Sequence, residues 1–321
     1  MTAGIVDIVT ATTGTHVPNS FFDGIGLTDE WIRRRTGVGA RWWIDESDSL
    51  EEMAARVCAP LVARHPDLPI AALLVVSSST GGAVPGIAQQ VATKAGLPTN
   101  TLTFDMSAAC TGFIYGLITG MSLCNGGSGA VIVCCVEAMS RMLDKTDRNT
   151  GPLFGDGAAA VLLESRPTFR DHRWHAGSDG DGADLMRGKL GQGIQLDGIR
   201  VYHRAVRTMT ETVKILREGD AGAGVEPSIV IGHPANSRIL QRVRDESDIG
   251  DAVFVDCVEN FGNTSAASIP LALGASLRAG TIPTSGRALL VAYGAGEAWG
   301  GVTVDFEFAA DLLDEHTGTP A

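Results

Sequence analysis

Three segments in the first half of the chain have counterparts in the second half at a nearly constant spacing. The matched pairs are the apolar runs 72–76 and 228–232, the helix openings at Cys110 and Asn263, and the apolar runs 130–136 and 287–293. Matched positions in these pairs differ by 156 (230 minus 74), 153 (263 minus 110) and 158 (290 minus 132) residues. A β-α-β order that recurs at one spacing is typical of two similar units packed on a common core. The sequence therefore predicts an α/β fold with two pseudo-symmetric βα halves.

Length and composition allow such a fold and divide the chain into four segments. The 321 residues, of which 44% are hydrophobic, can bury a large core. The expected segments are an N-terminal half (1–165), a Gly/Asp/Arg-rich connector or lid (166–198), a C-terminal half (199–308) and a flexible polar tail (309–321). The net charge of −12 argues against a general nucleic-acid binder, because such proteins neutralise phosphates with basic residues.

Cysteine spacing and hydropathy limit the expected compartment and cofactors. None of the six cysteines forms a Cys-x-x-Cys pair, which argues against a zinc ribbon or a thioredoxin motif, so no metal is expected. The cysteines lie mostly in apolar runs, as is usual in the reducing cytosol. Residues 1–9 lack a basic start and a long apolar core, and glycines and hydroxyls interrupt the weakly polar run 108–124. We therefore expect a cytoplasmic protein with no secretory signal and no membrane span.

Local patterns predict two short helices and one irregular segment. Residues 29–37 are expected to form a short basic helix that ends at a glycine. Residues 49–63 have helical apolar spacing and a capping box from Ser49 to Glu52, with a kink or a break at Pro60. Residues 165–198 show little periodicity and are expected to be irregular.

The stretch 104–117 combines a short strand, a turn of small residues and an apolar helix that begins just after Cys110. A thiol at that point faces the positive end of the helix dipole, which favours the nucleophilic thiolate. A free cysteine is, however, commonly a small buried apolar residue, so the residue type alone does not identify a nucleophile.

Two side chains of the second half are candidates to join Cys110 in one cleft. His233 follows a strand at its carboxyl end, where α/β proteins form their sites. Asn263 opens the helix that corresponds to the one after Cys110. Taken singly, His233 could be a loop histidine that bonds the backbone, and Asn263 could be a helix cap. The repeat favours the alternative, in which all three side chains converge.

Four sequence motifs are distributed over both halves of the chain. They are DMSAACTGF (105–113), FGDGAAAV (154–161), HPANSR (233–238) and GNTSAASIP (262–270). As a set, and in this order, they resemble β-ketoacyl-ACP synthase III, an enzyme family of the thiolase fold. The likeness runs from about residue 4 to residue 306. The resemblance implies a five-layered αβαβα architecture and a homodimer.

By this resemblance, the site is a Cys-His-Asn site for decarboxylative condensation. Cys110 would attack an acyl-CoA thioester and hold the acyl group. His233 and Asn263 would then donate hydrogen bonds to malonyl-ACP as CO2 leaves, and the resulting carbanion would attack the acyl-cysteine. The backbone N–H groups of Cys110 and Ala295 would form the oxyanion hole. The CoA thioester is a substrate, so the resemblance implies neither a metal nor a redox cofactor.

The resemblance also implies binding residues outside this catalytic group. A tryptophan and an arginine can enclose a planar adenine, and the residues that would bind CoA are Trp31, Arg35 and Arg148. The residues that would dock the acidic carrier protein are Arg238, Arg207 and Lys214. Neither a nucleic acid nor a membrane is expected as a partner.

The chain departs from the family pattern at three positions and in one length. Segment 184–198 is shorter than in housekeeping members of the family. Pro234 follows the histidine where glutamine is more usual. Val84 replaces a bulky aromatic residue that crosses the dimer interface into the acyl pocket of acetyl-specific members, so it would admit longer or branched primers. Glu297 replaces an apolar residue, and its carboxylate would be solvated or would contact a polar acyl group. Together these departures hint at a specialised starter-unit enzyme of fatty acid or polyketide biosynthesis.

Two other functions stay open on the sequence alone. An acyltransferase on the same scaffold would move the acyl group from Cys110 to a hydroxyl, an amine or a carrier thiol without decarboxylation. The presence of both His233 and Asn263 favours condensation over this transfer. A partner subunit without activity would only shape a pocket, and such subunits typically lack the cysteine.

Overall fold

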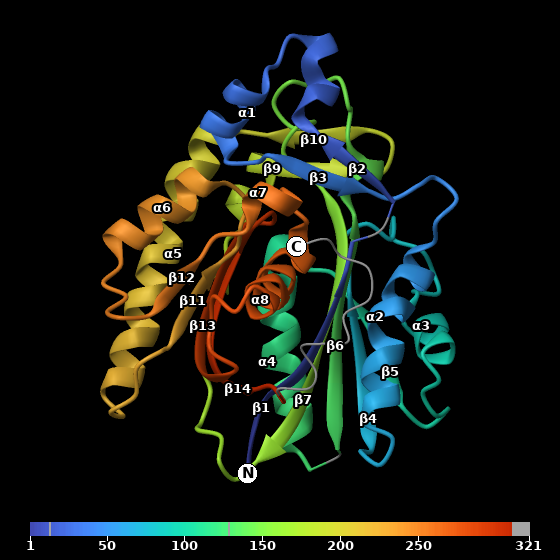
Figure 1. Ribbon diagram of the computed structural model, residues 1–321, viewed down its shortest axis with the longest axis vertical. Coiled ribbons are helices and arrows are strands. Elements are labelled where there is room, and N and C mark those ends of the chain that lie inside the picture. Colours follow the sequence, from blue (N-terminus) through green and yellow to red (C-terminus); the bar gives the residue numbers. More distant parts are fainter. Residues whose placement is uncertain (13, 128, 310–321) are drawn as a thin grey trace.

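The computed structural model describes residues 1–12, 14–127 and 129–309. Its main sheet contains two groups of five strands in corresponding order (Figure 1). The first group is β5 (Leu102–Met106), β4 (Ile70–Val76), β6 (Ala130–Ala138), β7 (Asp156–Arg166) and β1 (Thr2–Ala11). The second group is β12 (Val253–Val255), β11 (Ile229–Gly232), β13 (Ser285–Gly294), β14 (Ala298–Glu307) and β8 (Arg173–Ser178).

Strand directions also correspond between the two groups. In the first group β4 is parallel to β5 and β6, whereas β6–β7 and β7–β1 are antiparallel. In the second group β11 is parallel to β12 and β13, whereas β13–β14 and β14–β8 are antiparallel. The groups meet where β1 pairs with β14 in parallel, with Ile5 opposite Phe306. This correspondence confirms the two pseudo-symmetric halves.

Helices form three further layers around and between the two groups of strands (Figure 1). Helices α2 (Leu50–Arg64) and α3 (Ala88–Lys94) cover the outer face of the first group, and α5 (Gly198–Ala221) and α6 (Ser237–Glu246) cover that of the second. Helices α4 (Gly112–Asn125) and α8 (Ser268–Arg278) lie in the middle and share one core with the inner faces of both groups. The predicted five-layered αβαβα architecture is therefore confirmed.

Burial of the strands on both faces explains their continuous apolar sequence. In β6, Val133 faces the central layer, whereas Ile132 and Val136 face α2. The central helix α4 approaches this strand closely. A Cβ added to Gly116 or Gly120 would lie 2.8 or 2.9 Å from Val133, so glycine at these positions allows the close approach.

Two predicted helix boundaries are observed, and one predicted break is not. Helix α1 (Asp29–Thr36) ends at Gly37, and Oγ of Ser49 accepts a hydrogen bond from the amide of Glu52 at the start of α2. The helix does not break at Pro60, which was one of the two predicted alternatives, because α2 continues to Arg64. The apolar face around Pro60 is buried against the sheet, and this packing outweighs the loss of one helical hydrogen bond.

The expectation of an irregular segment after residue 165 is also wrong. Strand β8 belongs to the second half, and β9 (Met186–Lys189) and β10 (Gly193–Leu196) form a hairpin. These strands lack the apolar runs of the core strands because they are largely exposed or half-buried. Residues 310–321 of the predicted tail lie outside the described part of the chain.

A separate group of elements covers one end of the two halves (Figure 1). This cap consists of β2 (Thr15–Pro18), η1 (Asn19–Ile25), α1, β3 (Ala40–Trp43) and the β9–β10 hairpin. Its apolar side chains share a cluster with Leu153 and Phe154, just before β7. No helix in the described ranges is both long enough and apolar enough to cross a membrane.

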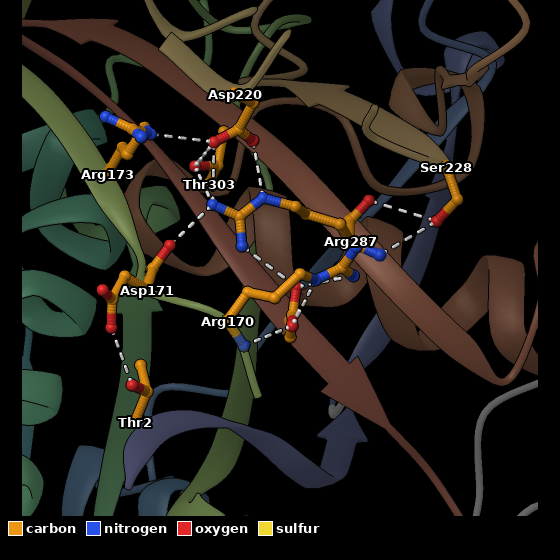
Figure 2. A network of polar contacts seen from close by, with 9 residues as sticks. Thr2, Arg170, Asp171, Arg173, Asp220, Ser228, Arg287 and Thr303 are labelled. Atoms are coloured by element: carbon orange, nitrogen blue, oxygen red, sulfur yellow. Dashed lines mark hydrogen bonds and ion pairs between the residues drawn. The ribbon is translucent and has the colours of Figure 1, made fainter. Parts of the chain in front are cut away.

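A buried network of charged side chains lies at the other end of α5 (Figure 2). Arg287, at the start of β13, is 2% exposed and donates hydrogen bonds to Asp220 at 2.9 Å and to Asp305 at 3.0 Å. Arg170 donates a further hydrogen bond to Asp305 at 2.9 Å. The network therefore ties α5, β13, β14 and the β7–β8 connection together.

Candidate active site

A cavity of about 800 Å³ contains side chains from both halves and from the cap. Cys110, His233 and Asn263 all line it. These residues follow β5, β11 and β12, at the carboxyl ends of strands in the two groups. The structure thus brings together the three side chains that the sequence singled out.

Each half has an elbow beside this cavity, that is, a turn into a short helix that begins with a residue of positive φ. Ala109 and Ser265 have positive φ angles of 45° and 51°, and they begin the short helices η2 (Ala109–Thr111) and η5 (Ser265–Ala267). Their spacing is 156 residues (265 minus 109), the same as between the starts of α4 and α8 (268 minus 112). The counterpart of Cys110 is therefore Ala266, and the predicted match of Cys110 with Asn263 is wrong by three residues.

Asn263 is held in place through both its backbone and its side chain. Its backbone amide donates a hydrogen bond to the carbonyl of Leu153 at 2.9 Å, and its backbone carbonyl accepts one from the amide of Gly155 at 3.0 Å, so it pairs with the segment before β7. Its Oδ1 accepts a hydrogen bond from the amide of Ser265 at 2.9 Å. The Nδ2 group is therefore the part of this carboxamide that can donate to a bound molecule.

The His233 imidazole is buried and has no partner within the described residues. It is 2% exposed, and neither Nδ1 nor Nε2 forms a hydrogen bond there. Burial lowers the pKa of His233 to about 3, because the charged form would lose its hydration. The ring is therefore neutral at pH 7 and presents one donor and one acceptor nitrogen.

The Cys110 thiol is also neutral in the resting protein. Burial, followed by the nearby charge of Glu137, raises the pKa of Cys110 to about 12. Hydrogen bonds from Ser265 and Asn263 act in the opposite direction but do not outweigh burial. The expectation that the helix dipole alone favours the thiolate is therefore wrong, because the thiol is enclosed by both halves. Its proton must leave during attack.

The chain passes very close to Cys110 at the end of β13. A Cβ added to Gly294 would lie 2.9 Å from the Cβ of Cys110 and 3.1 Å from its amide nitrogen. Glycine is therefore needed there for the thiol to keep its place. Ala295 follows directly and is half-buried. Its backbone N–H as part of an oxyanion hole stays a prediction.

Basic side chains surround the part of the cavity formed by α1 and α6. Trp31, Arg35, Arg148 and Arg238 all line it. The Arg35 guanidinium lies 5.3 Å from the centroid of the Trp31 ring, and the Arg35 carbonyl accepts a hydrogen bond from Asn236 before α6. In a chain with net charge −12, this local positive group favours an anionic ligand.

Sequence and structure comparisons agree with this arrangement. The profile of 3-oxoacyl-[acyl-carrier-protein (ACP)] synthase III matches residues 104–180, and that of its C-terminal part matches residues 224–306. Beta-ketoacyl-[acyl-carrier-protein] synthase III 1 of Halalkalibacterium halodurans is 35% identical over 301 residues, which cover 91% of this chain and 95% of that protein. The chain belongs to this family.

Solved structures of related enzymes have the same fold. The crystal structure of 3-oxoacyl-(acyl carrier protein) synthase III from Pseudomonas aeruginosa matches with a TM-score of 0.87 and 31% identity, and covers 96% of this chain and 99% of that one. The priming β-ketosynthase of the R1128 polyketide biosynthetic pathway matches with a TM-score of 0.86 and 26% identity, covering 95% and 96%. This chain is accordingly a ketosynthase-type acyltransferase of the carbon–carbon bond-forming class.

Two predicted docking residues of the synthase lie outside the cavity. Arg207 and Lys214 line a separate groove of about 750 Å³ beside α5 and α6. Tyr202 and His203 line both hollows, so the groove continues from the cavity along α5. A docking role for the two basic residues stays a prediction.

The two predicted acyl-pocket residues do not line the cavity of this chain. Val84 is 97% exposed. Glu297 is 5% exposed and forms an ion pair with Arg204 of α5, so its carboxylate is neither solvated nor free to contact an acyl group. Both expectations for Glu297 are wrong, because its partner lies 93 residues away in sequence. No pattern in the sequence indicated this pairing.

The sequence also missed cavity residues that carry no motif. Tyr293 in β13 and Met209 in α5 line the cavity, although each reads as a core residue in an apolar pattern. Glu137, which does not line the cavity but whose nearby charge raises the pKa of Cys110, was missed as well. Its signal was a single carboxylate at the end of the otherwise apolar run of β6.

Proposed function

We propose that the protein condenses an acyl-CoA with malonyl-ACP through an acyl-cysteine on Cys110. One observation carries this proposal: Cys110, His233 and Asn263 line a single cavity that also contains a group of arginines. A thiol, an imidazole and an amide in one buried space provide a nucleophile, a neutral base and two hydrogen-bond donors. No metal and no redox cofactor has a part in the proposed chemistry.

In the first half-reaction, Sγ of Cys110 attacks the thioester carbonyl of the acyl-CoA. Because the thiol is neutral, its proton leaves as the bond forms, and the neutral imidazole of His233 is the base in the cavity. The tetrahedral oxygen accepts hydrogen bonds from the backbone of Cys110 and Ala295. The C–S bond to CoA then breaks, CoA takes the proton, and the acyl group stays on Cys110.

In the second half-reaction, malonyl-ACP loses CO2 and its electron pair forms an enolate. Nδ2 of Asn263 and a ring N–H of His233 donate hydrogen bonds to the enolate oxygen. The enolate carbon attacks the acyl carbonyl, the C–S bond to Cys110 breaks, and the sulfur takes up a proton from solvent, since the original thiol proton has left with CoA. Burial of the site favours loss of CO2, because the carboxylate is desolvated there, whereas the charge that moves to the enolate oxygen is stabilised by these two hydrogen bonds.

We assign CoA binding to Trp31, Arg35 and Arg148. Replacement of Arg148 by alanine is expected to raise the KM for acyl-CoA about tenfold or more, because a charge-assisted hydrogen bond to phosphate contributes about 1.5–3 kcal/mol. The kcat should change little, since this side chain does not lie among the reacting groups. Steady-state kinetics with varied acyl-CoA measure the effect. Arg56→Ala, on the exposed side of α2, is the control, and an equal rise in that variant would contradict the assignment.

We further propose that the enzyme is a cytoplasmic homodimer that docks its carrier protein on Arg238, Arg207 and Lys214. These three basic residues lie on α5 and α6, beside the cavity and the groove. Strand β5 is at the edge of the sheet, and Leu102 on it is 52% exposed, as is fitting for pairing with a second copy. In such a homodimer Val84 would reach the acyl pocket of the partner subunit. Its small side chain would leave room there for a specialised starter unit.

The product on the carrier protein tests the proposed reaction. The enzyme is incubated with a panel of acyl-CoAs and malonyl-ACP, and the carrier is analysed by mass spectrometry. A 3-ketoacyl-ACP, formed with one CO2 per product, is the expected result. An acylated carrier, ester or amide without CO2 release would instead indicate the acyltransferase alternative and contradict condensation.

A further inference from the structure

A tight hairpin turn joins β13 to β14 beside the nucleophile. Gly294 pairs with Ala298 across the two strands, so residues 295–297 form the turn. Its start is close to the site, because a Cβ added to Gly294 would lie 2.9 Å from the Cβ of Cys110. The Ala295 backbone N–H, which the proposed chemistry uses in the oxyanion hole, belongs to this turn. The position of that N–H relative to the sulfur therefore depends on what holds the turn.

The last residue of the hairpin turn, Glu297, is held through its backbone. Its amide donates a hydrogen bond to the carbonyl of Asp179 at 3.0 Å, and its carbonyl accepts one from the amide of Asp179 at 2.9 Å. Ser178, which precedes Asp179, pairs with Ala298. The two hydrogen bonds therefore continue the ladder between β8 and β14 by one residue pair.

The Glu297 side chain is held as well, by a cation on α5. The residue is 5% exposed, and its carboxylate accepts a hydrogen bond from the guanidinium of Arg204 in an ion pair. The same guanidinium lies 3.7 Å from the carboxylate of Asp179. One half-buried arginine thus connects the hairpin turn, the end of β8 and α5.

Helix α5 also contributes to the cavity. Tyr202, His203 and Ala205, which are neighbours of Arg204 in sequence, line it. The ion pair therefore joins a wall of the cavity to the turn beside Cys110. Stability alone does not require charges here, because well-packed apolar residues of similar volume often stabilise a buried site equally well. A charge-assisted hydrogen bond adds a preferred direction, which favours one arrangement of the two groups that it joins.

We propose that Glu297 and Arg204 are positioning residues, which hold the hairpin turn where the Ala295 N–H can donate to the oxyanion formed when Cys110 attacks a carbonyl carbon. A donor in an oxyanion hole acts at about 2.7–3.1 Å from that oxygen, so a small displacement of the turn lowers the rate. The proposal deepens the function proposed above and rests on its nucleophile and its oxyanion hole.

Two reactions of Cys110 separate this role from a general effect on the fold. In acetylation by p-nitrophenyl acetate, Sγ bonds to the carbonyl carbon, negative charge develops on the carbonyl oxygen, and p-nitrophenolate leaves with the electron pair of the broken C–O bond. In alkylation by iodoacetamide, the same sulfur displaces iodide and no oxyanion forms. The thiol proton is lost in both reactions, so a change in the pKa of Cys110 affects both rates. The ratio of acetylation to alkylation therefore reports the oxyanion hole.

Both rates are followed in the full-length protein by mass spectrometry of the peptide that contains Cys110. In Glu297→Gln and in Arg204→Met we expect the ratio to fall about tenfold or more, because complete loss of one donor slows such reactions about 10²–10³-fold. Arg204→Lys keeps a cation and should recover part of the ratio.

The double variant Glu297→Gln/Arg204→Met leaves neither side chain with an unpaired charge. It should show the same loss as each single variant, because two side chains that act as a unit are not additive. It also covers the case in which a single variant does not fold, since a buried charge without its partner is the main cause of instability at such a pair.

The matched control is Arg64→Met, in an ion pair that joins α2 to β1 in the first half of the fold. Arg64 lies 3.1 Å from the carboxylate of Asp7, which is 1% exposed. This pair has the same chemistry and a similarly buried carboxylate, but its residues are not in the hairpin turn or in α5. Arg64→Met should therefore keep the wild-type ratio.

An unchanged ratio in the folded Glu297→Gln or double variant would overturn the proposal. An equal fall in Arg64→Met would do the same, because it would show a general effect of lost ion pairs, and so would a wild type that forms no acetyl adduct on Cys110. Neither reagent needs acyl-CoA or a carrier protein. The result is therefore distinguishable from success or failure of the condensation assay.

Discussion

Replacement of Cys110 by alanine is expected to abolish acylation of the enzyme by acyl-CoA and to reduce condensation by roughly 10⁴-fold or more, the usual scale for loss of a catalytic nucleophile. The reason is geometric, because Cys110 is the cysteine that lines the cavity with His233 and Asn263. Intact-mass analysis after incubation with acyl-CoA measures the adduct directly. The wild type should gain one acyl group per chain, and the variant should gain none.

A matched variant separates this effect from general loss of cysteine. Cys257 is half-buried and lines a different hollow, beside β12 and α8. Cys257→Ala should therefore acquire the acyl group as the wild type does. An adduct of normal yield on the Cys110→Ala protein, mapped to any other residue, would refute the assignment of the nucleophile.

Replacement of Arg287 by alanine is expected to lower the free energy of unfolding by about 3–5 kcal/mol, which is the usual effect of removing one member of a buried ion pair. The loss leaves Asp220, which is 1% exposed, next to Asp305, which is 5% exposed, without their shared cation (Figure 2). Two buried carboxylates would then repel each other. Urea unfolding followed by circular dichroism measures the change.

The exposed pair of Arg242 and Glu246 on α6 provides the control. Arg242→Ala should cost no more than about 1 kcal/mol, because solvent screens exposed ion pairs. An equal cost in the two variants would contradict the structural role of the network. Burial alone would raise the pKa of Asp305, but hydrogen bonds from Arg170 and Arg287 outweigh it and hold the pKa below its ordinary value. This contribution to stability is therefore present above the pKa of the unfolded chain and is lost as the pH falls.

The sequence predicted the architecture well, because strands buried on both faces are continuous apolar runs. The runs at 72–76 and 130–136 are β4 and β6, and their counterparts in the second half are β11 and β13. Strand β8 could not be found in this way. Its residues are exposed or half-buried, and its place is determined by backbone pairing with β14.

The sequence also identified the three residues of the candidate site. It did not show which residue of the second half corresponds to Cys110, or that the Cys110 thiol is protonated. Ala109 and Ser265 adopt positive φ angles without being glycine, so no residue type marked the elbows. The protonated thiol of Cys110 results from enclosure by segments far apart in sequence. Pairings such as that of Glu297 with Arg204 likewise depend on tertiary contacts that one sequence does not reveal.

The central claim is that residues of the two halves act together in one cavity. Release of CO2 from carboxyl-labelled malonyl-ACP by acylated His233→Ala and Asn263→Ala tests it most directly. Both variants keep Cys110. Asn263→Ala should accept an acyl group from acyl-CoA as the wild type does, whereas His233→Ala, which lacks the proposed base, should be acylated more slowly, so CO2 release is compared after acylation is complete. Their CO2 release should fall by about a hundredfold or more, because the enolate loses a hydrogen-bond donor that contributes about 3–4 kcal/mol. Normal CO2 release from either acylated variant would contradict the account.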